Sequence, residues 1–161
     1  MKSSDQTFLE MAIEKAKASV ARGGFPAGAV IVKDGNIIGE GISIGNIISD
    51  PTSHSEMASI RDACKNVQSS NISGSVLYAS MSPCIMCLSA AMWSGVVSVV
   101  FACRQDQVSP EYYGGHYDAS ILNKSFLHPL KLEHMPDLEL ESLEVIRAWE
   151  RKLTSPAIGE A

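Results

Sequence analysis

The chain has 161 residues, of which 45% are hydrophobic, and this is enough for one domain with its own core. We therefore predict a single domain over residues 1–161. The formal net charge is −5, so long-range electrostatics oppose binding to a phosphate backbone, and the composition favours a small-molecule substrate over a nucleic acid.

The first predicted element is an amphipathic helix. Thr7 and Glu10 stand in capping-box spacing, apolar residues then recur at helical intervals, and Gly23 ends the pattern. Glu10 and Glu14 interrupt any long apolar core, so the segment does not resemble a signal peptide. No apolar run approaches the length that spans a membrane. We therefore expect a cytoplasmic protein without a membrane partner.

A hairpin and a second helix follow. Residues 29–32 and 36–39 are apolar and flank an Asp-Gly pair, which predicts two antiparallel strands joined by a tight turn. Turn residues then lead to a helix that begins near His54. Ser53 and Glu56 stand in capping-box spacing at its start.

The centre of the chain predicts a strand, a helix and another strand. Residues 75–80 are short, apolar and β-prone. Ser82 is the predicted N-cap of the next helix, with Pro83 at its first position, and Gly95 ends that helix. Residues 96–101 form a nearly continuous apolar run, which is typical of a parallel strand buried on both faces.

The last third carries weaker patterns. After a polar, glycine-rich stretch that reaches about residue 118, we predict a short helix through Ile121-Leu122 and a strand at 130–132. Apolar residues at helical spacing predict a terminal helix over 140–153, and residues 154–161 are expected to fray. Helices that alternate with strands predict a three-layer α/β/α sandwich with a mixed sheet of about five strands.

Two short motifs carry the candidate chemistry. His54 and Glu56 open one predicted helix, and Pro83, Cys84 and Cys87 open another. One imidazole and two thiolates are donors that zinc prefers, and three protein ligands leave the fourth position open, as in catalytic sites. The positive end of a helix also favours thiolates over thiols. We therefore predict one zinc ion per chain, held by His54, Cys84 and Cys87, with Glu56 placed to move protons.

Other interpretations of these residues stay open at this point. In a cytosolic protein a lone Cys-x-x-Cys is as typical of a redox pair as of a metal site, so a noncatalytic zinc module or a redox thiol module is the alternative class. Glu56 alone could be a purely structural cap. An inactive interaction module is a third interpretation, which the presence of Glu56 beside all three ligands disfavours.

The other cysteines and histidines are less informative. Cys64 and Cys103 fit no ligand spacing, so we interpret them as small buried hydrophobes. His128, which precedes a proline, and His134 are interpreted as structural or surface residues. His116 lies in the segment 112–118, whose aromatic residues are unusual for a solvent-facing loop and could form a substrate wall.

From residue 8 to about 153 the chain resembles the cytidine deaminase superfamily of zinc-dependent nucleobase and nucleoside deaminases, especially its bacterial guanine deaminases. The resemblance rests on the segments 25–32, 50–56 and 82–87, which contain the His-x-Glu and Pro-Cys-x-x-Cys pattern of zinc deaminases. It implies a zinc-dependent hydrolase that acts on the C–N bond of a cyclic amidine, with Glu56 as the proton shuttle. It also implies a homodimer.

The same resemblance implies a base pocket that includes the backbone at Gly28, Ala29 and Ser82. The family asparagine that contacts substrate is replaced here by Ser43. Tyr113 and Asp118 are further predicted substrate contacts, because the loop offers aromatic faces and Asp118 could accept hydrogen bonds from ring N–H groups.

These residues rank the candidate substrates. A carboxylate in the pocket suits guanine or a related amino-purine, as free base or nucleoside, and a cytosine-type pyrimidine comes second. The transfer-RNA adenosine deaminases carry a small-residue segment where this chain has residues 104–110, so transfer RNA ranks third. The aromatic residue that ends many guanine deaminases is replaced by residues 157–161, Ala-Ile-Gly-Glu-Ala.

Overall fold

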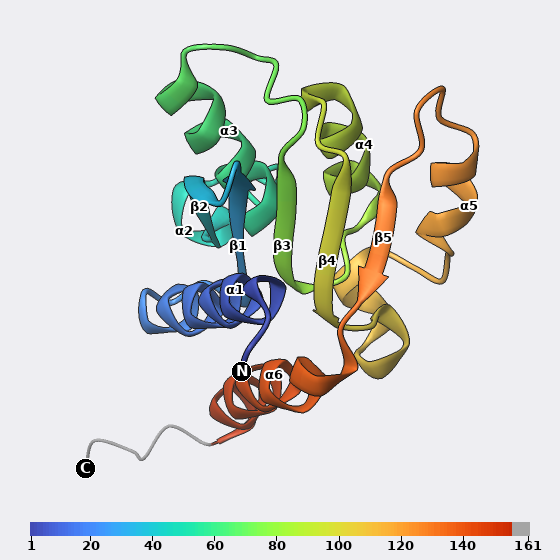
Figure 1. Cartoon of the computed structure of the whole chain (residues 1–161). Coiled ribbons are helices and arrows are strands. Elements are labelled where there is room, and N and C mark those ends of the chain that lie inside the picture. Colours follow the sequence, from blue (N-terminus) through green and yellow to red (C-terminus); the bar gives the residue numbers. More distant parts are fainter. Residues whose placement is uncertain (156–161) are drawn as a thin grey trace.

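The computed structural model describes residues 1–155, which form one sheet with helices on both faces (Figure 1). The strands are β1 (Phe25–Lys33), β2 (Asn36–Ser43), β3 (Val76–Met81), β4 (Ser98–Cys103) and β5 (Lys131–His134). The α-helices are α1 (Ser4–Ala21), α2 (Gly45–Ile48), α3 (Ser55–Val67), α4 (Ile85–Ser94), α5 (Ala119–Lys124) and α6 (Glu139–Thr154). Three short 3₁₀ turns are η1 (Gln105–Gln107), η2 (Pro110–Tyr113) and η3 (Pro136–Leu138).

The sheet has five strands in the order β2-β1-β3-β4-β5. β1 pairs antiparallel with both β2 and β3, whereas the β3–β4 and β4–β5 pairs are parallel. The predicted α/β fold with a mixed five-stranded sheet is therefore confirmed. The extent of the domain, residues 1–161, stays a prediction.

Alternation along the central strands divides the core into two layers, because successive side chains of a strand point to opposite faces. Ala29 and Ile31 of β1 pack in the layer that holds apolar residues of α3 and α4. Val30, between them, packs with Leu9 and Ile13 of α1. The apolar run of β4 behaves in the same way, with Val99 in the first layer and Val100 and Ala102 in the second. Both faces of the sheet are covered, as the apolar runs predicted.

The start of α1 differs from its prediction. Ser3 is the N-cap, and its hydroxyl accepts a hydrogen bond from the backbone N–H of Gln6 at 3.1 Å. Thr7 lies inside the helix, so the predicted Thr7–Glu10 capping box is wrong. Ser3 and Gln6 have the same three-residue spacing, and the earlier pair starts the helix because the segment 4–6 can also be helical.

The helices that follow the two motifs also begin later than predicted. α3 has His54 as its N-cap, without a side-chain capping bond, so the predicted Ser53–Glu56 box is wrong. α4 has Cys84 as its N-cap rather than Ser82, again without a side-chain capping bond. Two of the three predicted metal ligands, His54 and Cys84, therefore stand at the junction of a loop and a helix, in extended backbone conformation.

Later boundaries shift by one or two residues. β4 begins at Ser98 rather than at residue 96, and the predicted short helix and strand appear as α5 and β5. α6 continues through Thr154, where fraying was expected to begin. The rest of the predicted tail, residues 156–161, lies outside the described residues.

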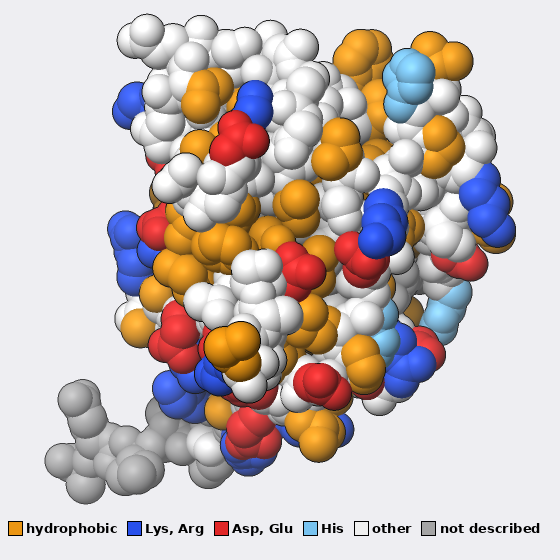
Figure 2. Space-filling model, viewed as in Figure 1, with side chains coloured by type: hydrophobic (Ala, Val, Ile, Leu, Met, Phe, Trp, Pro, Cys, Tyr) orange, Lys and Arg blue, Asp and Glu red, His pale blue; other side chains and the backbone are white. Residues whose placement is uncertain are grey.

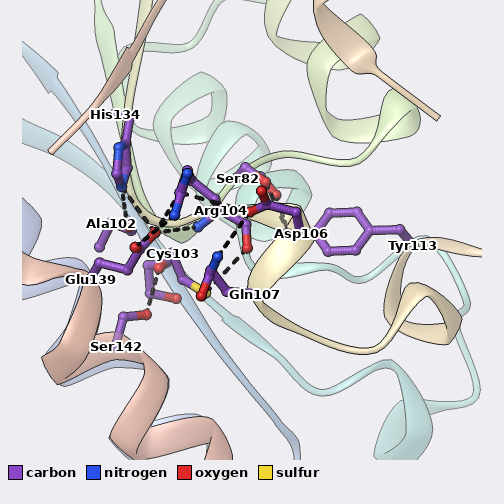
Figure 3. Close-up of polar contacts among 11 residues, drawn as sticks. Ser82, Ala102, Cys103, Arg104, Asp106, Gln107, Tyr113, His134, Glu139 and Ser142 are labelled. Carbon is purple, nitrogen blue, oxygen red and sulfur yellow. Dashed lines mark hydrogen bonds and ion pairs between the residues drawn. The ribbon is translucent and has the colours of Figure 1, made fainter. Parts of the chain in front are cut away.

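Polar contacts fix the start of α6 against the sheet (Figure 3). The Glu139 carboxylate accepts hydrogen bonds from the backbone N–H and the Nε of Arg104, both at 3.1 Å. It also lies 3.0 Å from Nε2 of His134 on β5. One turn later, the Ser142 hydroxyl donates to the carbonyl of Ser80 at 2.6 Å. These bonds fix the position of α6. Its last turns, with Trp149 and Leu153, then lie around the same cavity as Met81 at the carboxyl end of β3 and the motif residues His54 and Cys84.

The surface is mixed in charge. On the face seen in Figure 2, acidic and basic side chains are interspersed, and the basic ones do not gather into a stripe. Within residues 1–155, no helix combines the length and the hydropathy that crossing a membrane requires.

Candidate metal centre and active-site pocket

The structure brings the three predicted metal ligands together. Nδ1 of His54 lies 3.6 Å from Sγ of Cys84 and 3.6 Å from Sγ of Cys87, and the three ligand atoms lie within 4.8 Å of one another. With zinc–ligand bonds of about 2.0 to 2.3 Å, the edge of a tetrahedron is about 3.6 Å. The donor set and its spacing therefore fit one zinc ion.

Electrostatics at the two cysteines favour one thiolate even before a cation is considered. A hydrogen bond from Cys87 lowers the pKa of Cys84 to about 4, against the effect of burial, and His54 adds to the shift. The pKa of Cys87 is raised, because its proton is held by the bond to Cys84 and because the side chain is buried. A divalent cation would compensate the charge of a second thiolate, which is the form that binds zinc.

Glu56 lies in the first turn of α3 and is 6% exposed. Its Oε2 accepts a hydrogen bond from the Ser55 hydroxyl at 3.0 Å. Burial raises the pKa of its carboxyl, and the nearby Cys84 raises it further. Because Glu56 does not cap the helix, its carboxylate is available to the cavity that it lines together with His54 and Cys84.

This cavity has a volume of about 520 Å³, within the range of small-molecule sites. Its walls come from the loop before β1, the end of β2, the loop before α3, the turn η2 and the last turns of α6. Besides the residues already named, the lining includes Phe25, Ala27, Ser43, Asn46, Asp50, Ser53, Met81, Glu111, Tyr112, Tyr113, Trp149 and Leu153. The described residues that line it include carboxylates but neither lysine nor arginine.

The structure places two of the predicted substrate contacts in this cavity and four outside it. Ser43 and Tyr113 line it and are 7% and 9% exposed. Gly28 faces α1 so closely that a Cβ would collide with the backbone of Ala12 and Ala16, and Ala29 is buried in the core. The lining of the cavity includes the nearby Ala27 but neither Gly28 nor Ala29, and the role of these two backbones stays a prediction.

Asp118 and Ser82 also lie outside the cavity. The Asp118 carboxylate caps α5 by accepting a hydrogen bond from the backbone N–H of Ser120 at 2.8 Å. It is exposed and lines a neighbouring cavity of about 940 Å³, which Ser82 and His116 line as well. Asp118 is not among the residues that line the Glu56 cavity, and its contact with a substrate ring stays a prediction.

The sequence predicted an aromatic wall only from the segment 112–118, whereas the structure builds one from Tyr112 together with Phe25 and Trp149. The ring centroids of Phe25 and Tyr112 are 5.1 Å apart, those of Phe25 and Trp149 are 5.2 Å apart, and those of Tyr112 and Trp149 are 6.0 Å apart. The Tyr112 hydroxyl donates to Glu150 at 2.6 Å. The three rings come from distant segments, and Trp149 matched only the apolar face of a helix, so no pattern along the chain indicated that they meet.

The remaining cysteines and histidines are not near the three ligands in a metal-binding arrangement. Cys103 is fully buried, as predicted, whereas Cys64 is only partly buried and packs at the edge of the core. His134 contacts Glu139 and the carbonyl of Ala102, and His128 and His116 are exposed.

The chain was compared with known proteins. A family model described as the cytidine and deoxycytidylate deaminase zinc-binding region matches residues 2–103. The tRNA-specific adenosine deaminase of Aquifex aeolicus is 34% identical over 153 residues, which cover 94% of this chain and 97% of that protein. The guanine deaminase of Bacillus subtilis is 35% identical over 148 residues, which cover 89% of this chain and 92% of that protein.

A solved structure supports the same assignment. The X-ray structure of the Bacillus subtilis guanine deaminase matches with a TM-score of 0.65 at 32% identity and covers 98% of this chain and 99% of that one. The two curated relatives act on different substrates and are almost equally similar to this chain, so the expected distance from the transfer-RNA enzymes is not supported. The chain belongs to the cytidine and deoxycytidylate deaminase family and is a zinc-dependent deaminase, a hydrolase of C–N bonds.

Proposed function

We propose that this deaminase acts on a free nucleobase or nucleoside, with guanine or a related amino-purine as the first candidate. The cavity beside His54, Cys84 and Glu56 carries the proposal, because it combines an aromatic wall with carboxylates. A flat heterocycle can stack on such a wall, and the N–H groups of an amino-purine need acceptors. A phosphate group finds no cationic side chain among the described lining residues.

The proposed roles of the residues follow from their positions. His54, Cys84 and Cys87 hold one zinc ion, and the chemistry that zinc supplies in such a site is to lower the pKa of water toward neutrality. Glu56 accepts a proton from the attacking water and delivers it to the ring nitrogen, and it then transfers the remaining hydroxyl proton to the leaving amine as the carbonyl forms. The reaction consumes one water, breaks the bond between carbon and the exocyclic nitrogen, forms a carbonyl and releases ammonia.

Substrate recognition is assigned to the walls of the cavity. Phe25 and Trp149 would contact a face of the ring, while Ser43, Asn46 and Glu111 would contact its polar edge. Glu111 replaces Asp118 in this proposal as the carboxylate that accepts ring N–H groups. A cytosine-type pyrimidine is the alternative substrate: it has a smaller ring and would contact the same polar residues of the cavity.

Beside these small molecules, transfer RNA is the second class of candidate substrate, because the similar protein of Aquifex aeolicus is a tRNA-specific adenosine deaminase. The charge of the chain and the acidic lining argue for the smaller substrates. A substrate panel distinguishes them. Purified protein is incubated with guanine, guanosine, cytosine, cytidine, adenosine and an anticodon stem-loop, and released ammonia is measured.

We expect turnover of a free base or nucleoside. The 5′-monophosphate of the preferred nucleoside should react at least about tenfold more slowly, because its charge faces Asp50 and Glu111. Deamination of the stem-loop without turnover of any base or nucleoside would contradict this substrate class while leaving the family intact.

We also propose that the chain forms a homodimer through an apolar face of α4 and α5. Trp93 of α4 is 82% exposed, and four further large apolar side chains on α4, on α5 and just after α5 are exposed by 36 to 89%: Ile85, Ile121, Leu122 and Leu127. Apolar patches of this kind are typical of interaction surfaces. Because the resemblance implies a dimer, a second copy of the chain is the proposed partner.

Light scattering should therefore give twice the mass of the chain. Trp93→Glu should shift the protein toward monomer at micromolar concentration, because it replaces an exposed apolar side chain of the proposed interface with a charge. Leu140→Glu is the control, since Leu140 is 74% exposed but lies on α6. Equal masses for wild type and Trp93→Glu would rule out this face as the interface.

A further inference from the structure

Two tyrosine hydroxyls bond to the backbone on either side of the ligand Cys84. The Tyr113 hydroxyl donates a hydrogen bond to the carbonyl of Ser82 at 2.8 Å and lies 3.1 Å from the Ser82 hydroxyl, and Figure 3 shows its ring directed at Ser82. The backbone N–H of Ile85 donates to the Tyr117 hydroxyl at 3.3 Å. The two bonded residues bracket the dipeptide Pro83-Cys84.

This segment has few other bonds that could hold it. Pro83 has no N–H group, and Cys84 caps α4 without a side-chain capping bond. The first N–H groups of a helix have no partner within the helix, and that of Ile85 finds one in Tyr117. Apart from the tyrosines and the bonds within α4, the backbone bonds of this described segment are those from Ser82 N–H to the Cys103 carbonyl and from Leu88 N–H to the Cys84 carbonyl.

The tyrosines are themselves held in place. The Tyr113 ring is 9% exposed and packs with Met81, Cys103 and Ile146. Gly114 and Gly115 separate the tyrosines with φ angles of 74° and 148°, a backbone that residues with a Cβ rarely adopt. This reversal lets both hydroxyls reach the same short segment from one loop.

We propose that Tyr113 and Tyr117 are positioning residues for the metal centre, which hold the Ser82–Ile85 segment so that Cys84 stays at ligand distance from His54. The inference rests on the proposed role of Cys84 as a zinc ligand. It gives the segment 112–118 a role besides lining cavities: its hydroxyls set the geometry of the zinc site. Removal of a group that orients a ligand typically weakens metal binding by about 10- to 100-fold.

The test measures zinc affinity by competition with a chromophoric chelator, together with the absorption spectrum of the cobalt-substituted protein. Tyr113→Phe should raise the zinc Kd by about tenfold or more and shift the sulfur-to-cobalt charge-transfer bands. Tyr117→Phe should have a smaller effect in the same direction, because its bond is longer. Tyr112→Phe is the matched control, since that hydroxyl bonds to Glu150 on α6 and not to the ligand segment.

Wild-type affinity and spectrum in both Tyr113→Phe and Tyr117→Phe would overturn the inference, as would equal effects in Tyr112→Phe. If Tyr113→Phe does not fold, Tyr117→Phe against Tyr112→Phe decides the matter. Cys84→Ser distinguishes failure of the ligand assignment of Cys84 from failure of the positioning role of the tyrosines. If it retains full zinc affinity, the ligand assignment fails. If it loses zinc while the tyrosine variants do not, only the positioning role fails.

Discussion

Cys87→Ser should remove the zinc ion from the protein. Cys87 is fully buried in the first turn of α4, with its sulfur 3.6 Å from Nδ1 of His54. A serine hydroxyl is not deprotonated near neutral pH and is a poor ligand for zinc, so the three-donor set would be reduced to two. We expect zinc content to fall from about one per chain to below about 0.1, measured by elemental analysis.

The same variant should also unfold at a lower temperature, because metal binding to the native state contributes to stability. Removing zinc from the wild type with a chelator should lower its melting temperature in the same way, and adding zinc back should restore it only in the wild type. Cys64→Ser is the control, since Cys64 lies at the edge of the core and away from the ligands. Full zinc content in Cys87→Ser would exclude Cys87 as a ligand.

The sequence predicts the metal site well because its geometry is local. His54 and Glu56 are two residues apart, and Cys84 and Cys87 are three residues apart across a helix start, so the spacing within each motif already determines which of its side chains can meet at a helix end. The continuous apolar runs of the strands likewise predict helices on both faces of the sheet, since a strand between two helical layers must be apolar on both faces. The boundaries of helices are less well determined by the sequence. At the start of α1, for example, Ser3 with Gln6 and Thr7 with Glu10 have the same capping spacing.

The substrate cavity is predicted less well because it depends on contacts between distant segments. Trp149 on α6 contacts Phe25, and the position of α6 depends on the bonds of Glu139 and Ser142 to distant residues of the sheet. Asp118 was a plausible contact by composition, yet it precedes a helix, and the capping bond to Ser120 competes for its carboxylate. Neither outcome can be inferred from spacing along the chain.

Glu56→Gln should abolish most turnover while leaving zinc bound. The amide has nearly the same shape and can still accept a hydrogen bond from the Ser55 hydroxyl, which bonds to the carboxylate at 3.0 Å. It cannot accept and return a proton, and a positioned acid or base contributes about 10²- to 10⁴-fold to a rate. We expect kcat to fall by about that factor on the preferred substrate, with zinc content unchanged by elemental analysis.

The melting temperature separates this role from a structural one. Glu56 is 6% exposed, and a buried neutral amide avoids the cost of burying a charge, so we expect Glu56→Gln to be at least as stable as the wild type. A structural side chain would instead show a lower melting temperature with turnover intact. Glu144→Gln, on an exposed position of α6, controls for the change in net charge. Turnover of Glu56→Gln equal to that of the control would exclude Glu56 as the proton shuttle, and loss of zinc along with turnover would assign it to the metal site.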